Sequence, residues 1–338
     1  MKFKALLTIA LATAAIFVQT GCEKAEVPTV QNEVRTLRLA NVHVQDYPTS
    51  KACDYFAQRV SEETNGKIEI KCYHNAELGD EKTTIELLKM GNIDFVRVPT
   101  QLLTEYDDSL NLLTIPFMFK SEAHLWNVLN SEIGQNYLNS EKLKENGIIG
   151  LNWYYAGSRN FYVKDKQINT LEDLSGIVIR IQESESVVDM VNSLGAKPIP
   201  LAFGEVYSAM VTGSIDGAEN SWPSYISTKH YEVAKNIVCD EHLTVPEMIV
   251  ASSSTMDSLT EEERNIIKKC AEESTQKHIE YWNAAEAEAK QTAIDAGCVI
   301  TELSDAEKQK FRDAVQPVIE KYSAGYEELA QAIQSTPE

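Results

Sequence analysis

Arg180 is the residue of this 338-residue chain whose type and position most clearly suggest binding chemistry. It interrupts the apolar run GIVIRIQ, which has the β-branched composition of a buried strand. In a strand, Arg180 shares one face with Val178 and Gln182, while the isoleucines of the run share the other. A guanidinium holds its donors in a rigid fork that fits a carboxylate, and an unpaired buried charge is strongly destabilising. Arg180 is therefore expected to face either a protein carboxylate or a cleft that a ligand carboxylate fills.

Further polar and aromatic side chains fall at the ends of expected strands or near a glycine-containing junction. Parallel sheets with helical crossovers place ligands at the carboxyl ends of their strands, so these residues are expected to line one cleft. Such a cleft suits a small hydroxylated carboxylate. Taken singly, Arg97 and Glu77 are expected to be ordinary surface or ion-pair residues, and Trp222 could belong to the core. The candidates besides Arg180 are Gln182, Arg159, Asn220, His43, Asn41, Glu77, Arg97 and Trp222.

Sequence motifs of catalysis are absent. The chain has no Walker phosphate loop and no GxGxxG, HExxH or GxSxG pattern. Cys72 and His74 are two residues apart, but no second pair completes a zinc ligand set. We therefore predict a binding protein without catalysis, metal or cofactor. An enzyme that acts on sugar acids, with His43 and Glu77 as acid and base, is the alternative.

Residues 1–21 have the pattern of a signal peptide, with a basic start and an apolar stretch too short to span a bilayer. The following Gly21-Cys22 resembles a lipobox, although Gln19 stands where an aliphatic residue is usual. We predict an exported protein that is lipid-anchored at Cys22, in the periplasm or on the outer face of the cell membrane. Plain cleavage that leaves Cys22 free is the alternative. Residues 22–35 are polar and are expected to form the lipidated tether.

The overall charge and the cysteines narrow the class of protein further. The formal net charge is −20, which argues against nucleic-acid binding because that function needs a basic face. Any site for an anion must then create its positive field locally. Five cysteines follow Cys22, and an odd number cannot all pair within the chain. We expect them to be small buried hydrophobic residues rather than a disulfide framework.

Strand and helix patterns alternate in both halves of the chain. Each half has the order strand, helix, strand, helix, strand, which predicts a parallel sheet in each. A chain of this length can also form two lobes. The expected strands are 36–44, 67–73 and 93–98, then 176–182, 197–201 and 214–220, with helices at 49–66, 80–91, 184–195 and 204–213.

Two long apolar runs, 147–163 and 243–254, are expected to cross between the lobes, with Ala156-Gly157 as a point of flexure. After Leu259 a helical pattern continues for about ten turns and is expected to brace both lobes. Its start is marked by the capping box of Thr260 and Glu263, and its end by Gly297. The fold class is therefore α/β, with two lobes, hinge strands and a long bracing helix. We assign 36–156 plus 247–283 to lobe 1 and 157–246 plus 284–325 to lobe 2.

Several of these segments together resemble a known family, the DctP-type solute-binding proteins of tripartite ATP-independent periplasmic (TRAP) transporters. The likeness runs through nearly all of the mature chain, and its most specific motifs are LEDLSGIVIRIQES, GEVYSAMVTGSIDGAEN and HYEVAKN. The resemblance implies a periplasmic-binding-protein fold whose two lobes close on an organic acid. It also implies partners, namely the small and large membrane subunits of a TRAP transporter.

The resemblance also assigns roles to individual residues. The arginine in the strand after LSG makes the two-pronged contact with the substrate carboxylate, which implies that role for Arg180. By the same correspondence, Arg159 of GSRN is a second cationic contact and Asn220 of DGAEN a third contact. Asn41 matches a position that reaches the ligand in some members. The residues that vary with substrate subgroup are His43, Gln182, Glu77, Arg97 and Trp222.

The segments IRIQES, GAENSWPSY, HYEVAK and DEH resemble most closely the members that bind hexuronates such as glucuronate and galacturonate. The resemblance therefore implies an extracytoplasmic receptor for a sugar acid, with Gln182, His43, Glu77 and Asn220 as candidate partners for ring hydroxyls. Receptors for sialic acid, an aldonate or a C4-dicarboxylate are the alternatives. A sensor subunit that presents the same ligand to a membrane receptor is another.

Overall fold

The ten strands of this computed structural model, which describes residues 34–338, form one mixed sheet in the order β2-β1-β3-β9-β4-β7-β5-β6. Strand β8 pairs with β4, and β10 with β8. The predicted signal peptide, the predicted lipid attachment site at Cys22 and most of the predicted tether lie outside the described residues. The strands are β1 (Arg35–Ala40), β2 (Ile68–Tyr73), β3 (Phe95–Pro99), β4 (Ile148–Val163), β5 (Val178–Ile181), β6 (Lys197–Pro200), β7 (Gly217–Asn220), β8 (Asn236–Cys239), β9 (Leu243–Ser252) and β10 (Val299–Glu302).

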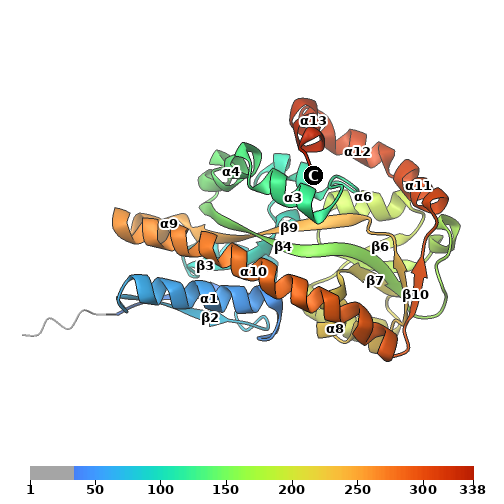
Figure 1. The fold of residues 1–338 in the computed structure, drawn as a ribbon, viewed down its shortest axis with the longest axis horizontal. Coiled ribbons are helices and arrows are strands. Elements are labelled where there is room, and N and C mark those ends of the chain that lie inside the picture. The colour runs from blue at the N-terminus through green and yellow to red at the C-terminus, as the bar shows by residue number, and fades with distance from the viewer. Residues whose placement is uncertain (1–33) are drawn as a thin grey trace, which may run out of the picture. The chain divides into compact units, whose positions relative to one another are not determined.

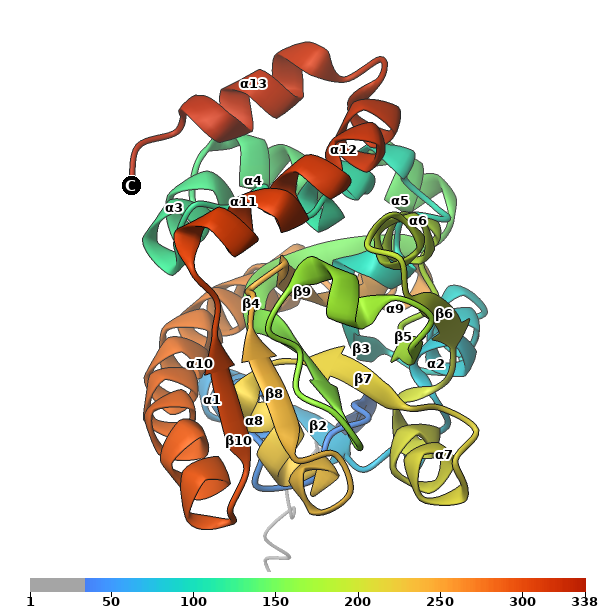
Figure 2. The same cartoon turned by 90° about the vertical axis from the view of Figure 1, so that its right-hand side faces the viewer.

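Helices cover both faces of this sheet, as Figures 1 and 2 show. None of the helices in the described part of the chain is both long and apolar enough to cross a membrane. The α-helices are α1 (Pro48–Glu63), α2 (Glu81–Lys89), α3 (Glu122–Leu129), α4 (Glu132–Leu138), α5 (Glu141–Glu145), α6 (Glu185–Ser193), α7 (Val206–Thr212), α8 (Trp222–Ser227), α9 (Ser253–Asp257), α10 (Glu261–Asp295), α11 (Asp305–Ala314), α12 (Gln316–Ser323) and α13 (Glu327–Ser335). The 3-10 helices are η1 (Thr100–Leu102), η2 (Asp108–Thr114), η3 (Leu171–Leu174), η4 (Phe203–Glu205) and η5 (His230–Glu232).

The two predicted strand–helix–strand units are confirmed as parallel units. Strand β1 pairs in parallel with β2 and β3, and β5 pairs in parallel with β6 and β7. Four clusters of buried apolar side chains, two for each unit, fill the space between the sheet and its helices. Each unit therefore has its own core on both faces, which explains the continuous apolar character of its strands. The chain ranges assigned to the two lobes stay a prediction.

Strands β4 and β9 lie between the two units and pair with each other in antiparallel fashion along most of their length. Their register shifts between Tyr155 and Ser158, which brackets the predicted point of flexure. Gly157 has φ +78°, and a Cβ there would lie 2.6 Å from Trp282 and 2.8 Å from Ser221. Only glycine fits at this position, because both the backbone angle and the close approach exclude a side chain.

The predicted long helix is confirmed as α10, which has 35 residues and a capping box formed by Thr260 and Glu263. At 1.5 Å per residue it is roughly 50 Å long. It packs against α1 of the first unit, against β4, and against α8 of the second unit (Figure 1). The helix therefore spans both units, as a brace must.

The C-terminal helices α11–α13 lie over the same side of the sheet as α3 and α4 (Figure 2). Ala330 and Ile333 of α13 belong to the apolar cluster that contains Leu125 and Val128 of α3. The five cysteines among the described residues are free thiols, and Cys53, Cys239 and Cys270 are buried.

Candidate functional site

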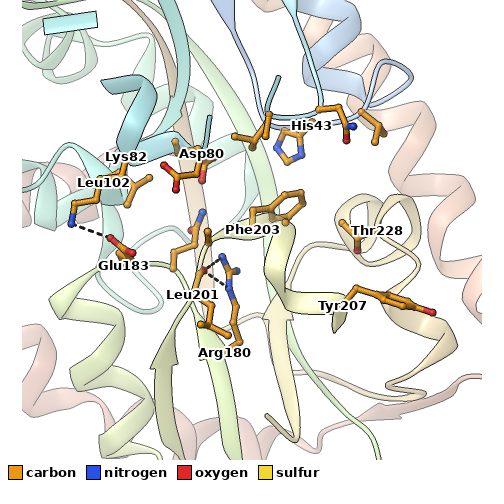
Figure 3. Close-up of a pocket in the computed structure, with 18 of the residues that line it drawn as sticks. His43, Asp80, Lys82, Leu102, Arg180, Glu183, Leu201, Phe203, Tyr207 and Thr228 are labelled. Atoms are coloured by element: carbon orange, nitrogen blue, oxygen red, sulfur yellow. Dashed lines mark hydrogen bonds and ion pairs between the residues drawn. The ribbon is translucent and has the colours of Figure 1, made fainter. Parts of the chain in front are cut away.

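A cavity of about 350 Å³ lies at the carboxyl ends of β1, β3, β5 and β6 (Figure 3). The first unit contributes the loop after β1, the start of α2 and η1. The second contributes the end of β5, the segment after β6, and the turn before η5. Residues that line the cavity include His43, Asp80, Glu81, Lys82, Leu102, Arg180, Gln182, Glu183, Leu201, Phe203, Tyr207, Thr228 and His230.

Arg180 lines this cavity and has no carboxylate partner among the described residues. Its side chain comes from β5, where Ile179 and Ile181 are fully buried in the apolar cluster of the second unit. Arg180 itself is 2% exposed, and its Nε and Nη2 both donate to the carbonyl oxygen of Leu201, at 2.9 and 2.6 Å. Burial lowers the pKa of Arg180. The Leu201 carbonyl thus orients the guanidinium by its Nε–Nη2 edge, and no described residue accepts from Nη1, so the Nη1–Nη2 edge is the one that a ligand carboxylate can contact.

Gln182 lines the cavity two residues after Arg180. Its Oε1 is buried and accepts no hydrogen bond from the residues that the structure describes. A buried acceptor without a donor is destabilising by about 1–3 kcal/mol. The Gln182 amide is therefore suited to accept a hydrogen bond from a ligand hydroxyl.

His43 forms part of the opposite wall, from the loop that follows β1. Its ring stacks on Tyr47 at a centroid distance of 3.9 Å and meets the edge of Phe203 at 4.9 Å. Phe203 belongs to the second unit, so this ring contact joins the two units within the cavity lining (Figure 3). Burial, with the nearby Arg97 as a second cause, holds the pKa of His43 well below its usual value. His43 is thus a neutral imidazole that can donate or accept a hydrogen bond.

Arg159 and Asn220 lie together in a buried network that does not line the cavity. The Arg159 guanidinium makes a two-pronged ion pair with Glu219, in which Nε contacts Oε2 and Nη2 donates to Oε1 at 2.8 Å. Its Nη1 donates to Oδ1 of Asn220 at 3.0 Å. Burial opposes ionisation of Glu219, but Arg159 and His242 lower the pKa of Glu219 to about 2. The protein itself therefore fills the Arg159 fork.

We expect the free energy of unfolding to fall as the pH rises from about 6.5 to about 9, because His242 loses its proton in that interval. Its Nδ1 lies 2.7 Å from Oδ2 of Asp240, and its Nε2 lies 3.5 Å from Oε2 of Glu219. Burial opposes the charge, yet these two carboxylates raise the pKa of His242 to about 9.

A group whose pKa is raised by folding contributes stability below its unfolded pKa and loses that contribution as the pH passes its folded pKa. For His242 the loss should be on the order of 2–3 kcal/mol. Chemical denaturation at about pH 6 and about pH 9.5 measures it, with His242→Gln as the control. If the free energy of unfolding of His242→Gln falls between these two pH values by as much as that of the native chain, another group is responsible.

Arg97 and Asn41 form a second buried network, in the first unit. Arg97 Nη1 lies 2.7 Å from Oε1 of Glu247, and Nη2 lies 2.9 Å from Oε1 of Glu81. Its Nε donates to Oδ1 of Asn41 at 3.1 Å, and Nδ2 of Asn41 donates to Oγ of Ser50 at 2.7 Å. Arg97 is thus a buried ion-pair residue that does not itself line the cavity. This agrees with the expectation that Arg97, taken alone, is an ordinary surface or ion-pair residue.

Two other candidates lie away from the cavity. Glu77 is exposed in the turn after β2 and does not line the cavity. Trp222 is 8% exposed and meets Tyr225 edge-on at 6.2 Å, within an apolar cluster of the second unit. Of the candidates from the sequence, the structure therefore brings Arg180, Gln182 and His43 together in the cavity lining.

Several residues that line the cavity were not among the candidates from the sequence. Asp80 was part of an expected helix, and its Oδ1 caps α2 by accepting from the amide of Thr83 at 2.8 Å. Lys82 and Glu183 form an ion pair of 3.1 Å between the first and second units (Figure 3). Phe203 follows an apolar strand, and only its position after β6 could have drawn attention to it.

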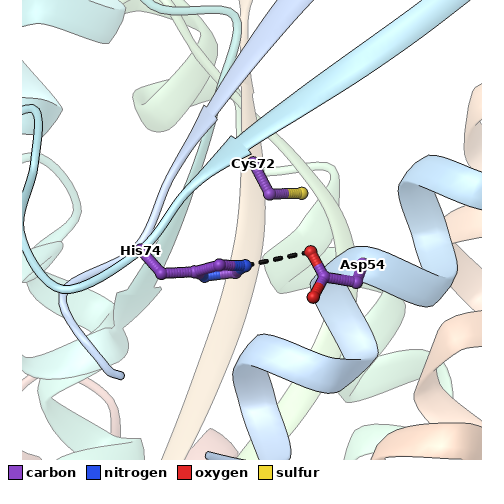
Figure 4. A group of neighbouring side chains, drawn as sticks. All are labelled: Asp54, Cys72 and His74. Atoms are coloured by element: carbon purple, nitrogen blue, oxygen red, sulfur yellow. Dashed lines mark hydrogen bonds and ion pairs between the residues drawn. The ribbon is translucent and has the colours of Figure 1, made fainter. Parts of the chain in front are cut away.

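A small cluster of potential metal ligands lies behind His43, where Asp54, Cys72 and His74 come within 4.8 Å of one another (Figure 4). Cys72 and His74 are the pair noted in the sequence, and α1 adds Asp54. His74 Nε2 lies 2.9 Å from Oδ1 of Asp54, and Nδ1 lies 3.3 Å from Nδ2 of Asn41. Asn41 presents its amino group there because its Oδ1 accepts from Arg97. Nδ1 is thus the acceptor and Nε2–H the donor, so no imidazole lone pair is free for a metal.

Comparison with known proteins gives consistent results. Residues 39–325 match the DctP family, described as bacterial extracellular solute-binding protein, family 7. A solute-binding protein of Chromohalobacter salexigens is 35% identical over 289 residues, which is 86% of this chain and 85% of that protein.

Two solved structures of TRAP periplasmic solute-binding proteins are also similar. The protein from a Sulfitobacter species, with bound β-D-galacturonate, has a TM-score of 0.84 and 36% identity over 89% of this chain and 99% of its own. The protein from Roseobacter denitrificans, with bound β-D-glucuronate, has a TM-score of 0.85 and 35% identity over 89% of this chain and 100% of its own.

Proposed function

Because this chain belongs to the bacterial extracellular solute-binding protein family 7, we propose that it captures a hexuronate outside the cytoplasm and delivers it to a TRAP membrane transporter. Glucuronate and galacturonate are the favoured ligands, since similar structures contain them. The small and large TRAP membrane subunits are the proposed partners, and the lipid expected on Cys22 would hold the receptor at the membrane. The observation that carries the proposal is Arg180, a buried cation that lines the cavity without a protein carboxylate beside it.

The charges around the cavity favour an acid with one carboxylate. Of the cavity-lining cations in residues 34–338, Lys82 is paired with Glu183, and Arg180 alone has no carboxylate partner. Burial lowers the pKa of His43 well below its usual value and the pKa of His230 to about 3, so both rings are neutral. A ligand with one carboxylate pairs with Arg180, whereas a second buried carboxylate would find no unpaired cation in the lining to offset its desolvation and would meet the carboxylates of Asp80 and Glu81.

The cavity also supports binding without catalysis. The enzyme alternative needs His43 and Glu77 to act on one substrate as acid and base, within hydrogen-bond reach of it. His43 lines the cavity, but Glu77 is exposed outside the lining. We therefore infer a receptor that releases its ligand unchanged.

A thermal-shift screen tests this proposal. D-Glucuronate and D-galacturonate should raise the melting temperature, since a ligand at a hundredfold excess over its Kd stabilises the folded form by about 2.7 kcal/mol. The corresponding hexarates, which have a second carboxylate on the same carbon skeleton, are the matched controls and should give smaller shifts. Sialic acid, gluconate and succinate complete the set. A larger shift with a hexarate or succinate contradicts the single-carboxylate argument, and no shift with any organic acid contradicts the receptor itself.

A further inference from the structure

His230 lines the cavity but was not among the candidates from the sequence. It is the first residue of η5, and its side chain is hydrogen-bonded to Tyr162 of β4. Nδ1 of His230 lies 2.7 Å from the hydroxyl oxygen of Tyr162. His230 is 1% exposed and Tyr162 is 0% exposed, so this hydrogen bond is shielded from bulk water.

The partners of Tyr162 fix the tautomer of the imidazole. Within the described part of the chain, His230 is the only hydrogen-bond partner of the Tyr162 hydroxyl. A buried hydroxyl must donate its proton to an acceptor, so Tyr162 donates to Nδ1. Nδ1 then carries the lone pair, and the proton of the neutral ring is on Nε2. Burial, together with the charge of Arg180, lowers the pKa of His230 to about 3, which keeps the ring neutral.

We propose that His230 donates a hydrogen bond from Nε2–H to the bound sugar acid, next to the carboxylate held by Arg180, and so helps to determine specificity. Nε2 makes no hydrogen bond with the residues that the structure describes, and it is the polar atom with which the ring can face the cavity. Tyr162 is a positioning residue, because it fixes which nitrogen donates. This inference rests on the proposed function, since it names a further contact in the same site.

A neutral donor suits this position better than a second cation. Arg180 already supplies the charge that one carboxylate needs, and a protonated His230 would add repulsion in the empty cavity. A neutral N–H adds a directional hydrogen bond without altering the charge balance. His230 can thus distinguish a ligand with an acceptor oxygen at this point from one with an apolar group there.

Two variants of His230 distinguish the contact made by Nδ1 from the contact made by Nε2. Isothermal titration calorimetry measures their affinities for D-glucuronate and D-galacturonate. In His230→Asn the shorter side chain can still reach Tyr162 but not the ligand, so affinity should fall about tenfold, because a buried acceptor of the ligand loses its donor. In His230→Gln the amide reaches the place of Nε2 and should retain affinity within a few-fold of native. Equal affinity of His230→Asn and the native chain, with native binding intact, overturns this inference alone. Absence of native binding instead overturns the proposed function.

The tautomer itself can be observed by long-range ¹H–¹⁵N correlation spectroscopy of the native protein. We expect an unprotonated Nδ1 and a protonated Nε2 for His230. In Tyr162→Phe the Nδ1 signal should shift, because its hydrogen bond is gone. A protonated Nδ1 in the native protein, or an unchanged Nδ1 signal in Tyr162→Phe, contradicts the role of Tyr162.

Discussion

Replacing Arg180 by alanine is expected to weaken hexuronate binding by more than about 2 kcal/mol, or roughly thirtyfold. The guanidinium is buried, is oriented by the carbonyl of Leu201, and has no carboxylate of the described chain beside it. Its removal therefore deletes a charge-assisted contact from a desolvated site. Isothermal titration calorimetry with D-glucuronate and D-galacturonate measures the loss directly.

A second variant tests whether binding needs the two-pronged shape of the Arg180 guanidinium or only its charge, and a third serves as the control. Arg180→Lys should also bind poorly, because a point charge cannot make a two-pronged contact. Lys277→Ala is the matched control, since it removes an exposed cation that pairs with Glu280 on α10, and it should bind like the native chain. The empty Arg180→Ala protein should remain folded, because no protein carboxylate loses its partner. Intact binding with a large loss of stability would instead show that Arg180 is structural.

Replacing Glu219 by alanine should destabilise the protein by about 3–5 kcal/mol, because it leaves the Arg159 cation buried without its partner. Arg159 is 2% exposed and Glu219 is 1% exposed, so water cannot replace the lost carboxylate. Chemical denaturation of the ligand-free chain gives this free energy. The double variant Arg159→Met/Glu219→Met removes both charges and should recover much of the loss.

An exposed ion pair provides the control for this experiment. Lys290 and Glu302 lie 2.8 Å apart with side chains 46% and 61% exposed, and Glu302→Gln should cost less than about 1 kcal/mol. The family resemblance implies that Arg159 contacts the substrate, whereas the structure pairs it with Glu219. If Arg159→Met abolishes binding but leaves stability unchanged, the direct contact is the correct interpretation.

Periodicity was sufficient to predict those elements whose residues are buried in a regular pattern. The apolar runs around Ile179 and Ile249 and the capping box at Thr260 each carry a local signal for β5, β9 and α10. Strands β8 and β10 have four residues each, as β5, β6 and β7 do, but they lie outside the two repeats of strand and helix by which those strands were recognised. These two strands, and the helices between β3 and β4, were not predicted.

The candidate site was also predictable only where a local sequence pattern gave a signal. Arg180 was recognised as a candidate because a cation within a buried apolar strand is unfavourable without an anionic partner. The partner of Arg159 could not be inferred, because Glu219 lies sixty residues away and comes beside it only through the pairing of β4 with β7. His230 begins the family-like segment HYEVAKN, but its role could not be inferred from that segment, since the role depends on Tyr162 in a distant strand. Spacing along the chain thus identified side chains in need of a partner but not the partners themselves.

The buried cysteines have a practical consequence for an exported protein. A thiol reacts as its thiolate, and burial raises the pKa of Cys239 to about 12 and that of Cys270 to about 11. Burial also raises the pKa of Cys53. These thiols are thus slow to be alkylated or to exchange with disulfides while the fold is intact. A fluorophore could therefore be attached to a new surface cysteine without first replacing these three thiols, once the partly exposed Cys72 and Cys298 have been replaced.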